Sequence, residues 1–541
     1  MKQWLIVFFV CLASGLFAQS NYWVYFNDKP NNIPSVSEKT LVRYAKAGYE
    51  ARNQDAAVSI EYIKQISGLA SVKHRLTSRW LNAISVEVID QQLIQVIELM
   101  PFVKKVTPLK AYSPIARENV IVDFKHTNHN HDSLQVGIDQ LNAQFLADRG
   151  FFGEGMTIAV IDNGFRDADQ LDAFKHVFDQ GRVKGYYDFV DNDTTLFDAT
   201  AGTHGRSVWS FMAADLPGKY LGSAPQANYW LFRTEASAFE RQVEEDYWLA
   251  AAEMADSVGV DLITTSLGYT TFDGDTNNYT YASMDGNTSI ITRAADAAAK
   301  RGIFVVSSNG NAGRDSWKYM GAPADGDSVL AVGAVNRNGG IASFSSFGPT
   351  FDGRIKPDVL AWGSGAAYIT GNDEVGYGSG TSFSAPLTAG LVTCLWQALP
   401  DKTANEIRLA IIETASEFNN PSDQGGNGLS NFCAAYKKLG GKFCYLPEIQ
   451  GPDAFLYAYY NTDLKQIQLT LDLNGSGSGS YFGYSFDGVK LFQRNFSYVN
   501  KQGATNFYIP WEVKNQSQKI LIIKMMIDGK ESVKKLLIHQ Q

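Results

Sequence analysis

Three residues that together could carry out acyl transfer lie far apart in the chain, in the order Asp162, His204 and Ser382. A serine hydroxyl is a poor nucleophile until an imidazole removes its proton. The imidazole needs a carboxylate on its second nitrogen, which fixes the tautomer and stabilises the imidazolium. Each residue alone is typical of a turn or a helix start. Because Asp, His, Ser is one of the orders in which such a triad occurs, the three together predict a nucleophilic serine.

Ser382 lies in a glycine-rich stretch, GYGSGTSFSAP at 376–386, which an uncharged apolar segment follows. The pattern predicts a turn that leads into a buried helix, with Pro386 in the first helical turn. Ser382 would then be either an N-cap or a nucleophile at the helix N-terminus. A phosphate-binding loop is disfavoured because no lysine follows the glycines. A nucleophile elbow is disfavoured because Ser384 stands in place of its second glycine.

Acyl transfer also builds negative charge on the carbonyl oxygen, and a side-chain amide can stabilise it. The segment SSNGNAG at 307–313 follows an apolar strand pattern and offers Asn309 and Asn311 as donors. Asn309 also fits a simple Asn-Gly turn. The sequence therefore predicts an oxyanion donor in this segment and leaves two candidates.

The elements around these residues alternate over 133–445, where short apolar strands are followed by helical patterns. This predicts an α/β domain with a mostly parallel sheet and helices on both faces. Strands are expected at 156–161, 229–232, 262–266, 303–306 and 329–333, and helices at 205–214, 240–258, 289–300 and after residue 382. In such a sheet, reacting residues collect at the carboxyl ends of the strands and at the adjoining helix starts.

Two flanking regions differ from this domain. Residues 19–112 fit the order β-α-β-α-β, which predicts a small ferredoxin-like α+β sheet. An exposed linker is expected at 113–132; its three closely spaced histidines could bind a metal but are interpreted as solvated. Residues 446–541 lose the helical pattern, and their alternating strands predict an all-β sandwich.

Composition and the N-terminus indicate an exported protein. The 541 residues are 45% hydrophobic and 19% charged, an ordinary globular composition, and the net charge of −9 argues against a nucleic-acid partner. Residues 1–18 combine Lys2 with an apolar run and end on Ala18, which favours a secretory signal over a membrane anchor. We expect no membrane span elsewhere.

The four cysteines are too few for a disulfide scaffold. Cys11 would leave with the signal segment. Cys394 lies in the apolar segment behind Ser382 and is expected to be a buried free thiol. Cys433 and Cys444 are expected to pair, because disulfides persist in exported chains.

Several short motifs, in order along residues 159–386, resemble those of the subtilisin-like serine proteases (subtilases). They are AVIDNG at 159–164, THG at 203–205, SLG at 266–268, GNAG at 310–313, ASFSSFGP at 342–349 and GTSFSAP at 380–386. The resemblance implies a secreted serine endopeptidase with Asp162, His204 and Ser382 as the triad and Asn311 as the oxyanion donor. A catalytically silent subtilase fold used for binding or adhesion is the alternative.

The resemblance also implies substrate contacts. It makes Ser266, Leu267 and Gly268 a wall of the cleft whose backbone pairs with an extended peptide, and it places Ser308 and Asn309 near the S1 pocket. Two departures put specificity in question: Arg206 stands where the family usually has threonine, and Asn309 where a small apolar residue is common. No cofactor is required. Calcium is possible, for example at the acidic loop 188–198, although no EF-hand spacing is present.

The flanking regions acquire roles through the same resemblance. Residues 19–112 resemble the ferredoxin-like propeptide that assists folding and inhibits the enzyme, so the chain would be an autoprocessed preproprotein first cut in the linker. Residues 446–541 are weakly similar to C-terminal sorting domains of Bacteroidetes secreted proteins, and a plain accessory sandwich stays open. The expected partners are protein or peptide substrates and the chain's own propeptide.

Overall fold

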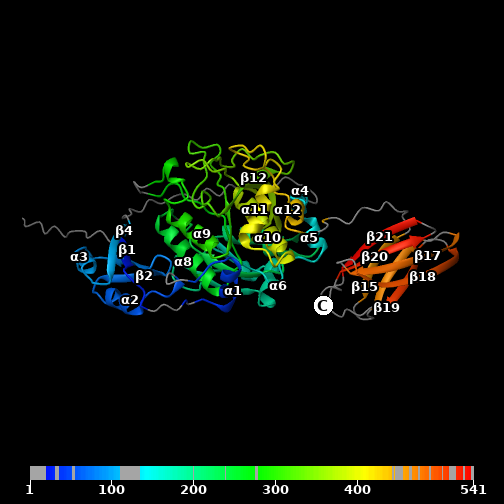
Figure 1. The fold of residues 1–541 in the computed structure, drawn as a ribbon, viewed down its shortest axis with the longest axis horizontal. Coiled ribbons are helices and arrows are strands. Elements are labelled where there is room, and N and C mark those ends of the chain that lie inside the picture. Colours follow the sequence, from blue (N-terminus) through cyan, green and yellow to red (C-terminus); the bar gives the residue numbers. More distant parts are fainter. Residues whose placement is uncertain are drawn as a thin grey trace, which may run out of the picture. The chain divides into compact units, whose positions relative to one another are not determined.

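The computed structural model describes residues 20–109, 134–441, 444 and 455–537, with gaps at 31–33, 35, 52–54, 199, 238, 274–277, 462–465, 473–474, 486–488, 502–503, 511–519 and 528–529. The expected signal segment at 1–18 and the linker at 113–132, with its histidines, lie outside the described residues. The chain divides into two compact units, residues 1–141 with 153–435 and residues 142–152 with 436–541 (Figure 1).

The larger unit is built on an eight-stranded sheet with the order β14-β13-β12-β11-β10-β5-β9-β6. Its strands are β5 (Thr157–Asp162), β6 (Val183–Asp188), β9 (Asn228–Arg233), β10 (Leu262–Thr265), β11 (Phe304–Ser308), β12 (Leu330–Asn336), β13 (Val359–Ile369) and β14 (Val375–Ser379). Neighbouring strands are parallel, except that β14 runs antiparallel to β13. The predicted α/β class with a mostly parallel sheet is confirmed, although β6, β13 and β14 were not predicted.

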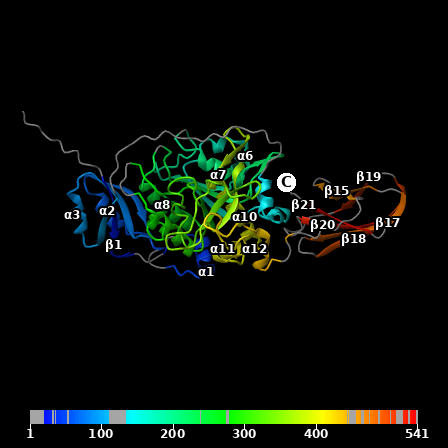
Figure 2. The same cartoon turned by 90° about the horizontal axis from the view of Figure 1, so that it is seen from above.

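Helices cover both faces of this sheet. α8 (Val243–Val258) and α9 (Ile290–Lys300) share a hydrophobic core with alternate strand residues such as Ala159 and Ile263. α10 (Thr381–Ala398) packs along β10 to β13 and against α7 (His204–Ala213); Figure 2 shows α10 apart from α8. The other helices of residues 134–441 are α4 (Gln135–Gln140), α5 (Gln144–Asp148), α6 (Asp172–Asp179), α11 (Ala404–Glu413) and α12 (Phe432–Lys438). Two short strands, β7 (Asp215–Leu216) and β8 (Tyr220–Leu221), form a separate pair.

The glycine-rich stretch before Ser382 is a strand and not the predicted turn. Its residues form β14, which pairs with β13 and leads directly into α10. A Cβ atom at Gly376 would lie 2.7 Å from the side chain of Thr370, and one at Gly378 would lie 2.4 Å from the ring of Phe383. The glycines therefore allow neighbouring side chains to pack closely on the strand, and this role cannot be distinguished from turn formation by residue type.

The start of α10 also differs from the prediction. Gly380 is the N-cap residue, and Ser382 is the second residue of the helix. The N-cap interpretation of Ser382 is therefore wrong. Pro386 is the sixth helical residue and lies in the second turn, not in the first. Its missing N–H thus removes a bond inside the helix rather than one at its free end.

Residues 20–109 form a four-stranded antiparallel sheet with the order β2-β3-β1-β4. The elements are β1 (Ser20–Phe26), α1 (Glu38–Lys46), α2 (Ile60–Ser67), β2 (Val72–Ser78), β3 (Ala83–Val88), α3 (Leu93–Glu98) and β4 (Val103–Leu109). The ferredoxin-like topology is confirmed, but the prediction missed β2. The register of β2 shifts between His74 and Leu76, which breaks the alternation that identifies a strand.

This N-terminal sheet has two buried faces. One face packs on its own helices, with Val24 and Val86 against Ile66 and Ile97. The other face contributes Trp23, together with Leu76 and Ala83, to the core that contains α8 and α9. A continuous apolar core therefore joins residues 20–109 to the helices α8 and α9 that cover the eight-stranded sheet.

The smaller unit contains two antiparallel sheets. One has the order β15-β16-β19 and the other β18-β17-β20-β21. Their strands are β15 (Phe455–Asn461), β16 (Gln466–Asp472), β17 (Gly475–Ser485), β18 (Lys490–Lys501), β19 (Ala504–Pro510), β20 (Ile520–Ile527) and β21 (Lys530–Leu537). The rings of Tyr481 and Phe496 contact Phe507 of the other sheet. The predicted all-β fold is confirmed, with β15 and β18 added.

The cysteines follow the prediction. Cys433 and Cys444 are disulfide-bonded, and Cys394 is a buried free thiol whose pKa is raised by burial. Among the described residues, no helix has the length and apolar character needed to cross a membrane.

Candidate active site

Four elements of the larger unit carry the predicted catalytic side chains. Asp162 is the last residue of β5, His204 the first of α7 and Ser382 the second of α10, and Asn311 follows β11. β10 lies between β5 and β11 in the sheet. Because the three strands are parallel, their carboxyl ends share one edge, and the candidate site lies along it.

Asp162 and His204 are in direct contact. His204 Nδ1 lies 2.7 Å from Asp162 Oδ1, and the Asn163 N–H donates to the same oxygen at 2.8 Å. Asp162 is fully buried, whereas 37% of the His204 side chain is exposed. The carboxylate therefore holds the ring from the protein side, and Nε2 is the nitrogen left for a proton acceptor role.

Gly205 allows this close approach. A Cβ atom there would lie 2.6 Å from the Gly164 carbonyl oxygen and 2.8 Å from Asp162 Cβ. Any larger residue would push the start of α7 away from β5. The glycine of the Thr-His-Gly motif is thus explained by packing at the first turn of the helix.

The Asp162 carboxylate changes the acidity of His204. Burial disfavours the charged imidazolium and lowers its pKa, but the negative charge of Asp162 and its hydrogen bond favour the charged ring and outweigh burial. The net result is a raised pKa. A raised pKa makes the imidazole a stronger base towards a serine hydroxyl.

Ser382 lies in the first turn of α10, where unpaired N–H groups and the helix dipole favour negative charge. Its Oγ donates to the carbonyl oxygen of Ser266 at 3.3 Å. Among the hydrogen bonds of the described residues, none joins Ser382 to His204. The hydroxyl is therefore held beside β10 in this state and has to rotate to reach an imidazole.

The two asparagine candidates have different environments. Asn309 is fully buried, and its Nδ2 donates to the Ser346 carbonyl at 2.7 Å. Asn311 is exposed, and its Oδ1 accepts from the N–H and the hydroxyl of Thr381 at 2.9 and 3.0 Å. Thr381 thus holds the carbonyl oxygen of the Asn311 amide, which leaves Nδ2 as the atom that can donate to another group. In the sequence, the position of Thr381 directly before Ser382 is the one signal that could have indicated this role.

The predicted substrate-binding residues follow strands of the same edge. Ser266 and Leu267 are buried directly after β10, and Gly268 is exposed. Ser308 is the buried last residue of β11. Of these residues, Gly268 is the exposed one, and their contact with a peptide stays a prediction.

Arg206, the departure from the family pattern, is buried on α7. Its Nη1 donates to the Arg166 carbonyl at 2.7 Å and lies 3.9 Å from Asp167 Oδ2. Burial lowers its pKa, and Asp167 counteracts this effect. Arg206 therefore connects α7 to the loop after β5.

Two carboxylates of the acidic loop considered for calcium already pair with the guanidinium group of Arg233, at the end of β9. Arg233 Nη1 lies 2.5 Å from Asp188 Oδ2 and 2.7 Å from Asp191 Oδ2. Asp188 Oδ1 accepts the N–H groups of Val190 and Asp191. Across the described ranges, no group of three or more His, Cys, Asp or Glu side chains could hold a metal ion.

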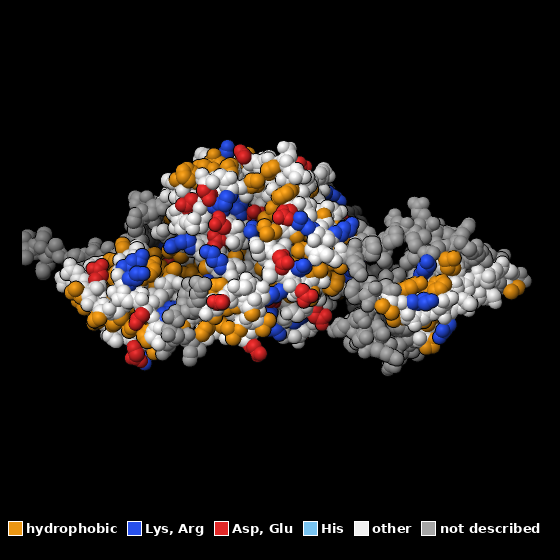
Figure 3. All heavy atoms as spheres, viewed as in Figure 1, with side chains coloured by type: hydrophobic (Ala, Val, Ile, Leu, Met, Phe, Trp, Pro, Cys, Tyr) orange, Lys and Arg blue, Asp and Glu red, His pale blue; other side chains and the backbone are white. Residues whose placement is uncertain are grey.

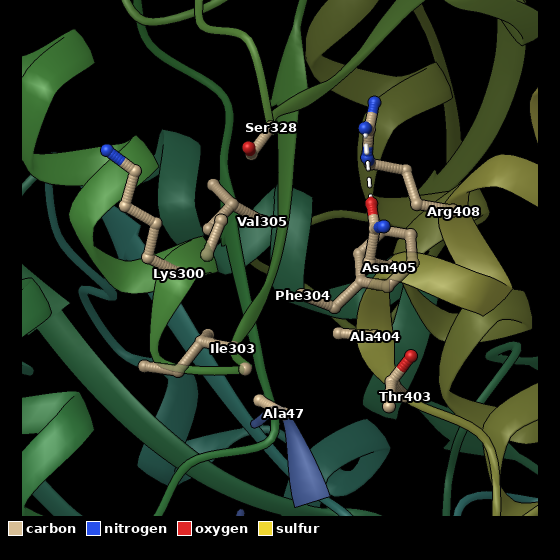
Figure 4. A pocket seen from close by; sticks show the side chains of 12 residues that line it. Ala47, Lys300, Ile303, Phe304, Val305, Ser328, Thr403, Ala404, Asn405 and Arg408 are labelled. Atoms are coloured by element: carbon tan, nitrogen blue, oxygen red, sulfur yellow. Dashed lines mark hydrogen bonds between the residues drawn. The ribbon is translucent and has the colours of Figure 1, made fainter. Parts of the chain in front are cut away.

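A cavity of about 330 Å³ lies at the other end of β11, beside Phe304. Figure 4 shows Ala47, at the end of α1, and Asn405 and Arg408 of α11 around it. β11 runs from Phe304 at this cavity to Ser308 at the candidate site. The cavity is therefore distinct from the cluster of Asp162, His204 and Ser382.

Comparisons with known families agree with this division of the chain. The Subtilase family of peptidases S8 matches residues 153–433, and the Peptidase S8 propeptide domain of Bacteroidota matches residues 21–122. The first match includes every residue of the candidate site. The second covers the ferredoxin-like sheet.

Individual relatives show the same likeness. Serine protease AprX of Bacillus subtilis is 31% identical over 283 residues, which cover 47% of this chain and 60% of that protein. Subtilisin E of Bacillus subtilis is 30% identical over 318 residues, which cover 58% of this chain and 74% of that protein. The solved structure of the epidermin leader peptide processing serine protease of Staphylococcus aureus shares the fold, with a TM-score of 0.53 and 15% identity over 77% of this chain and 99% of that one. The family match, which extends over more than half of the sequence, shows that this chain belongs to the subtilase family of serine endopeptidases.

Proposed function

We propose that the chain is an exported endopeptidase in which Ser382 is the nucleophile, His204 the general base and acid, and Asp162 the residue that orients the imidazole. The observation that carries this proposal is the 2.7 Å contact between His204 Nδ1 and the buried Asp162 carboxylate. It lies on the sheet edge where α10 presents Ser382.

The reaction takes place in two halves. His204 Nε2 removes the proton of Ser382 Oγ while this oxygen attacks the peptide carbonyl, and Asp162 stabilises the imidazolium that forms. The imidazolium then protonates the leaving amine, which breaks the C–N bond and leaves an acyl-enzyme. A water molecule repeats the sequence, giving its proton to His204 and releasing the carboxylic acid and the Ser382 hydroxyl.

Asn311 is proposed to stabilise the oxyanion of both tetrahedral intermediates. Its Oδ1 is held by Thr381, so Nδ2 is the atom that can donate to a developing charge. The N-terminus of α10 adds a favourable dipole at the same place. Asn309 is a poorer donor, because its Nδ2 is already bound to Ser346 inside the protein.

The substrate is proposed to be an extended peptide that pairs with the backbone of residues 266–268. Ser308 and Asn309 would lie near the side chain before the cleaved bond. The face drawn in Figure 3 carries acidic and basic side chains side by side, and such a mixed surface does not favour a nucleic acid. A protein substrate is therefore the partner that the site supports best.

We also propose that residues 1–18 are a signal segment and residues 19–112 a propeptide. The propeptide family match and the shared core of Trp23 with α8 and α9 support this division. The first cut would fall in the linker at 113–132. The domain at 446–541 would serve sorting or act as an accessory sandwich.

Covalent labelling tests the nucleophile directly. A serine-directed phosphonate should inactivate the purified protein, and peptide mass spectrometry should locate the label on Ser382. Ser384→Ala is the matched control, since Ser384 lies in the same helix but its hydroxyl donates to the Thr381 carbonyl. Labelling of Ser384, or no labelling of an active protein, would contradict the proposal.

A further inference from the structure

The carbonyl of Ser382 lies inside a helix but lacks its usual helical donor. In an α-helix the N–H of residue i+4 bonds this carbonyl, and here that residue is Pro386, which has no N–H. Pro386 is the sixth residue of α10 and therefore lies beyond the first four positions, whose N–H groups have no acceptor within the helix. A half-buried carbonyl without a donor costs free energy, and another group can offset that cost.

The Ser266 hydroxyl is that group. Its Oγ donates to the Ser382 carbonyl at 3.1 Å, and only 6% of Ser266 is exposed. Ser266 directly follows β10, the strand between those that lead to Asp162 and Asn311. The bond therefore ties the first turn of α10 to the strand at the centre of the candidate site.

A second bond runs in the opposite direction between the same residues. Ser382 Oγ donates to the Ser266 carbonyl at 3.3 Å. This second bond has to break when the hydroxyl turns to His204, whereas the first involves only the Ser382 main chain and can persist. The two bonds thus have different roles, one for the backbone of the nucleophile and one for its resting side chain.

We propose that Ser266 is a positioning residue, whose hydroxyl supplies the donor that Pro386 removes and thereby fixes Ser382 against β10. This proposal rests on the proposed function of Ser382. Because a peptide would pair with the backbone of Ser266 and not with its hydroxyl, loss of the hydroxyl should affect turnover more than substrate binding.

The first test is kinetic. Ser266→Ala should lower kcat roughly tenfold, the effect of about one net hydrogen bond, with KM changed less than about twofold. Adding Pro386→Ala to Ser266→Ala supplies an N–H to the same carbonyl, so kcat should recover to within about threefold of the unmodified protein.

Thr388→Val is the matched control. Thr388 Oγ1 donates to the Ser384 carbonyl at 2.9 Å, and that carbonyl keeps the N–H of residue 388 as its helical donor. Loss of this hydroxyl should change kcat less than about twofold. An equal loss in Thr388→Val and Ser266→Ala, or no recovery with Pro386→Ala, would overturn the proposal.

A melting-temperature cycle tests the same bond without activity. In the Ser382→Ala background the main-chain carbonyl remains and self-cleavage is blocked. There, Ser266→Ala should lower the melting temperature by roughly 2 °C with Pro386 present and change it little in combination with Pro386→Ala. Equal effects in both backgrounds would mean that Ser266 does not serve this carbonyl. If the unmodified protein hydrolyses no peptide, the proposed function fails, and the cycle still decides the role of Ser266.

Discussion

Two fully buried aspartates, Asp162 and Asp256, have opposite surroundings. Asp162 faces one titratable ring, His204, and its Oδ2 has no hydrogen-bond partner among the described residues. Asp256, on α8, accepts hydrogen bonds from the guanidinium groups of Arg43 and Arg79 and from the Tyr44 hydroxyl at 2.6 Å. All three donors to Asp256 come from residues 20–109.

The difference separates a site for chemistry from a site for assembly. The partners of Asp256 stay charged at every physiological pH or do not ionise, so this cluster can only hold two parts of the chain together. The partner of Asp162 can gain and lose a proton near neutral pH. Burial makes both interactions strong, and the type of partner decides which of them can take part in a reaction.

The largest expected effect comes from Ser382→Ala. We expect a loss of activity of roughly 10⁶-fold, the value known for the nucleophile of a subtilisin. Free energy of unfolding should hardly change, because the hydroxyl makes one long bond of 3.3 Å. The variant should also keep residues 20–112 after signal removal, as read by N-terminal sequencing. Equal maturation of variant and unmodified protein, without added protease, would show that another enzyme makes the cut.

Asp256→Asn should have the reverse effect of Ser382→Ala, because it should lower stability. It leaves buried guanidinium groups without their counter-charge, so unfolding free energy of the uncleaved chain should fall by about 3–5 kcal/mol. Urea denaturation in the Ser382→Ala background measures this. Asp179→Asn is the control, because Asp179 forms an exposed pair with Lys175 that should contribute less than about 1 kcal/mol. Equal losses of unfolding free energy for Asp256→Asn and Asp179→Asn would contradict the role of Asp256 in holding the two parts of the chain together.

Asn311→Ala should lower kcat by roughly 10²–10³ with KM little changed, the loss known for this amide in a subtilisin. Asn309→Ala should instead lower unfolding free energy, since the Ser346 carbonyl loses a buried donor. Steady-state kinetics and thermal melting of both variants separate the two roles. The assignment is wrong if Asn309→Ala has the kinetic defect and Asn311→Ala does not.

The smallest expected effect is a shift in the pH dependence of activity. The pKa of His204 is raised above its ordinary value of 6.5, and the neutral ring is the base. kcat/KM should therefore fall as pH drops through a value above 6.5, about tenfold per pH unit below it. Asp162→Asn should move this acid limb to lower pH, because the charge that favours the imidazolium is lost. An acid limb at the same pH in both proteins would show that another group titrates.

Residue types and their local pattern determined much of this protein. Apolar strands that alternate with amphipathic helices are a local signal, so the α/β class followed from the sequence. The same holds, to within one residue, for the end of β5 and the start of α7, which carry Asp162 and His204, whereas β11 extends beyond the predicted strand and α10 begins before Ser382. Motif order then led to the subtilase family, which the family comparison confirms.

Contacts between distant residues decided the rest. Thr381 and Ser346 distinguish Asn311 from Asn309, and both lie beyond the range of any local pattern. The glycines of β14 looked like turn residues because only Thr370 and Phe383, once folded beside them, require the absence of a Cβ. Arg43 donates a hydrogen bond to Asp256, although 213 positions of sequence separate the two residues. Sequence periodicity reports which face of an element is buried, but only the tertiary structure determines what lies against it.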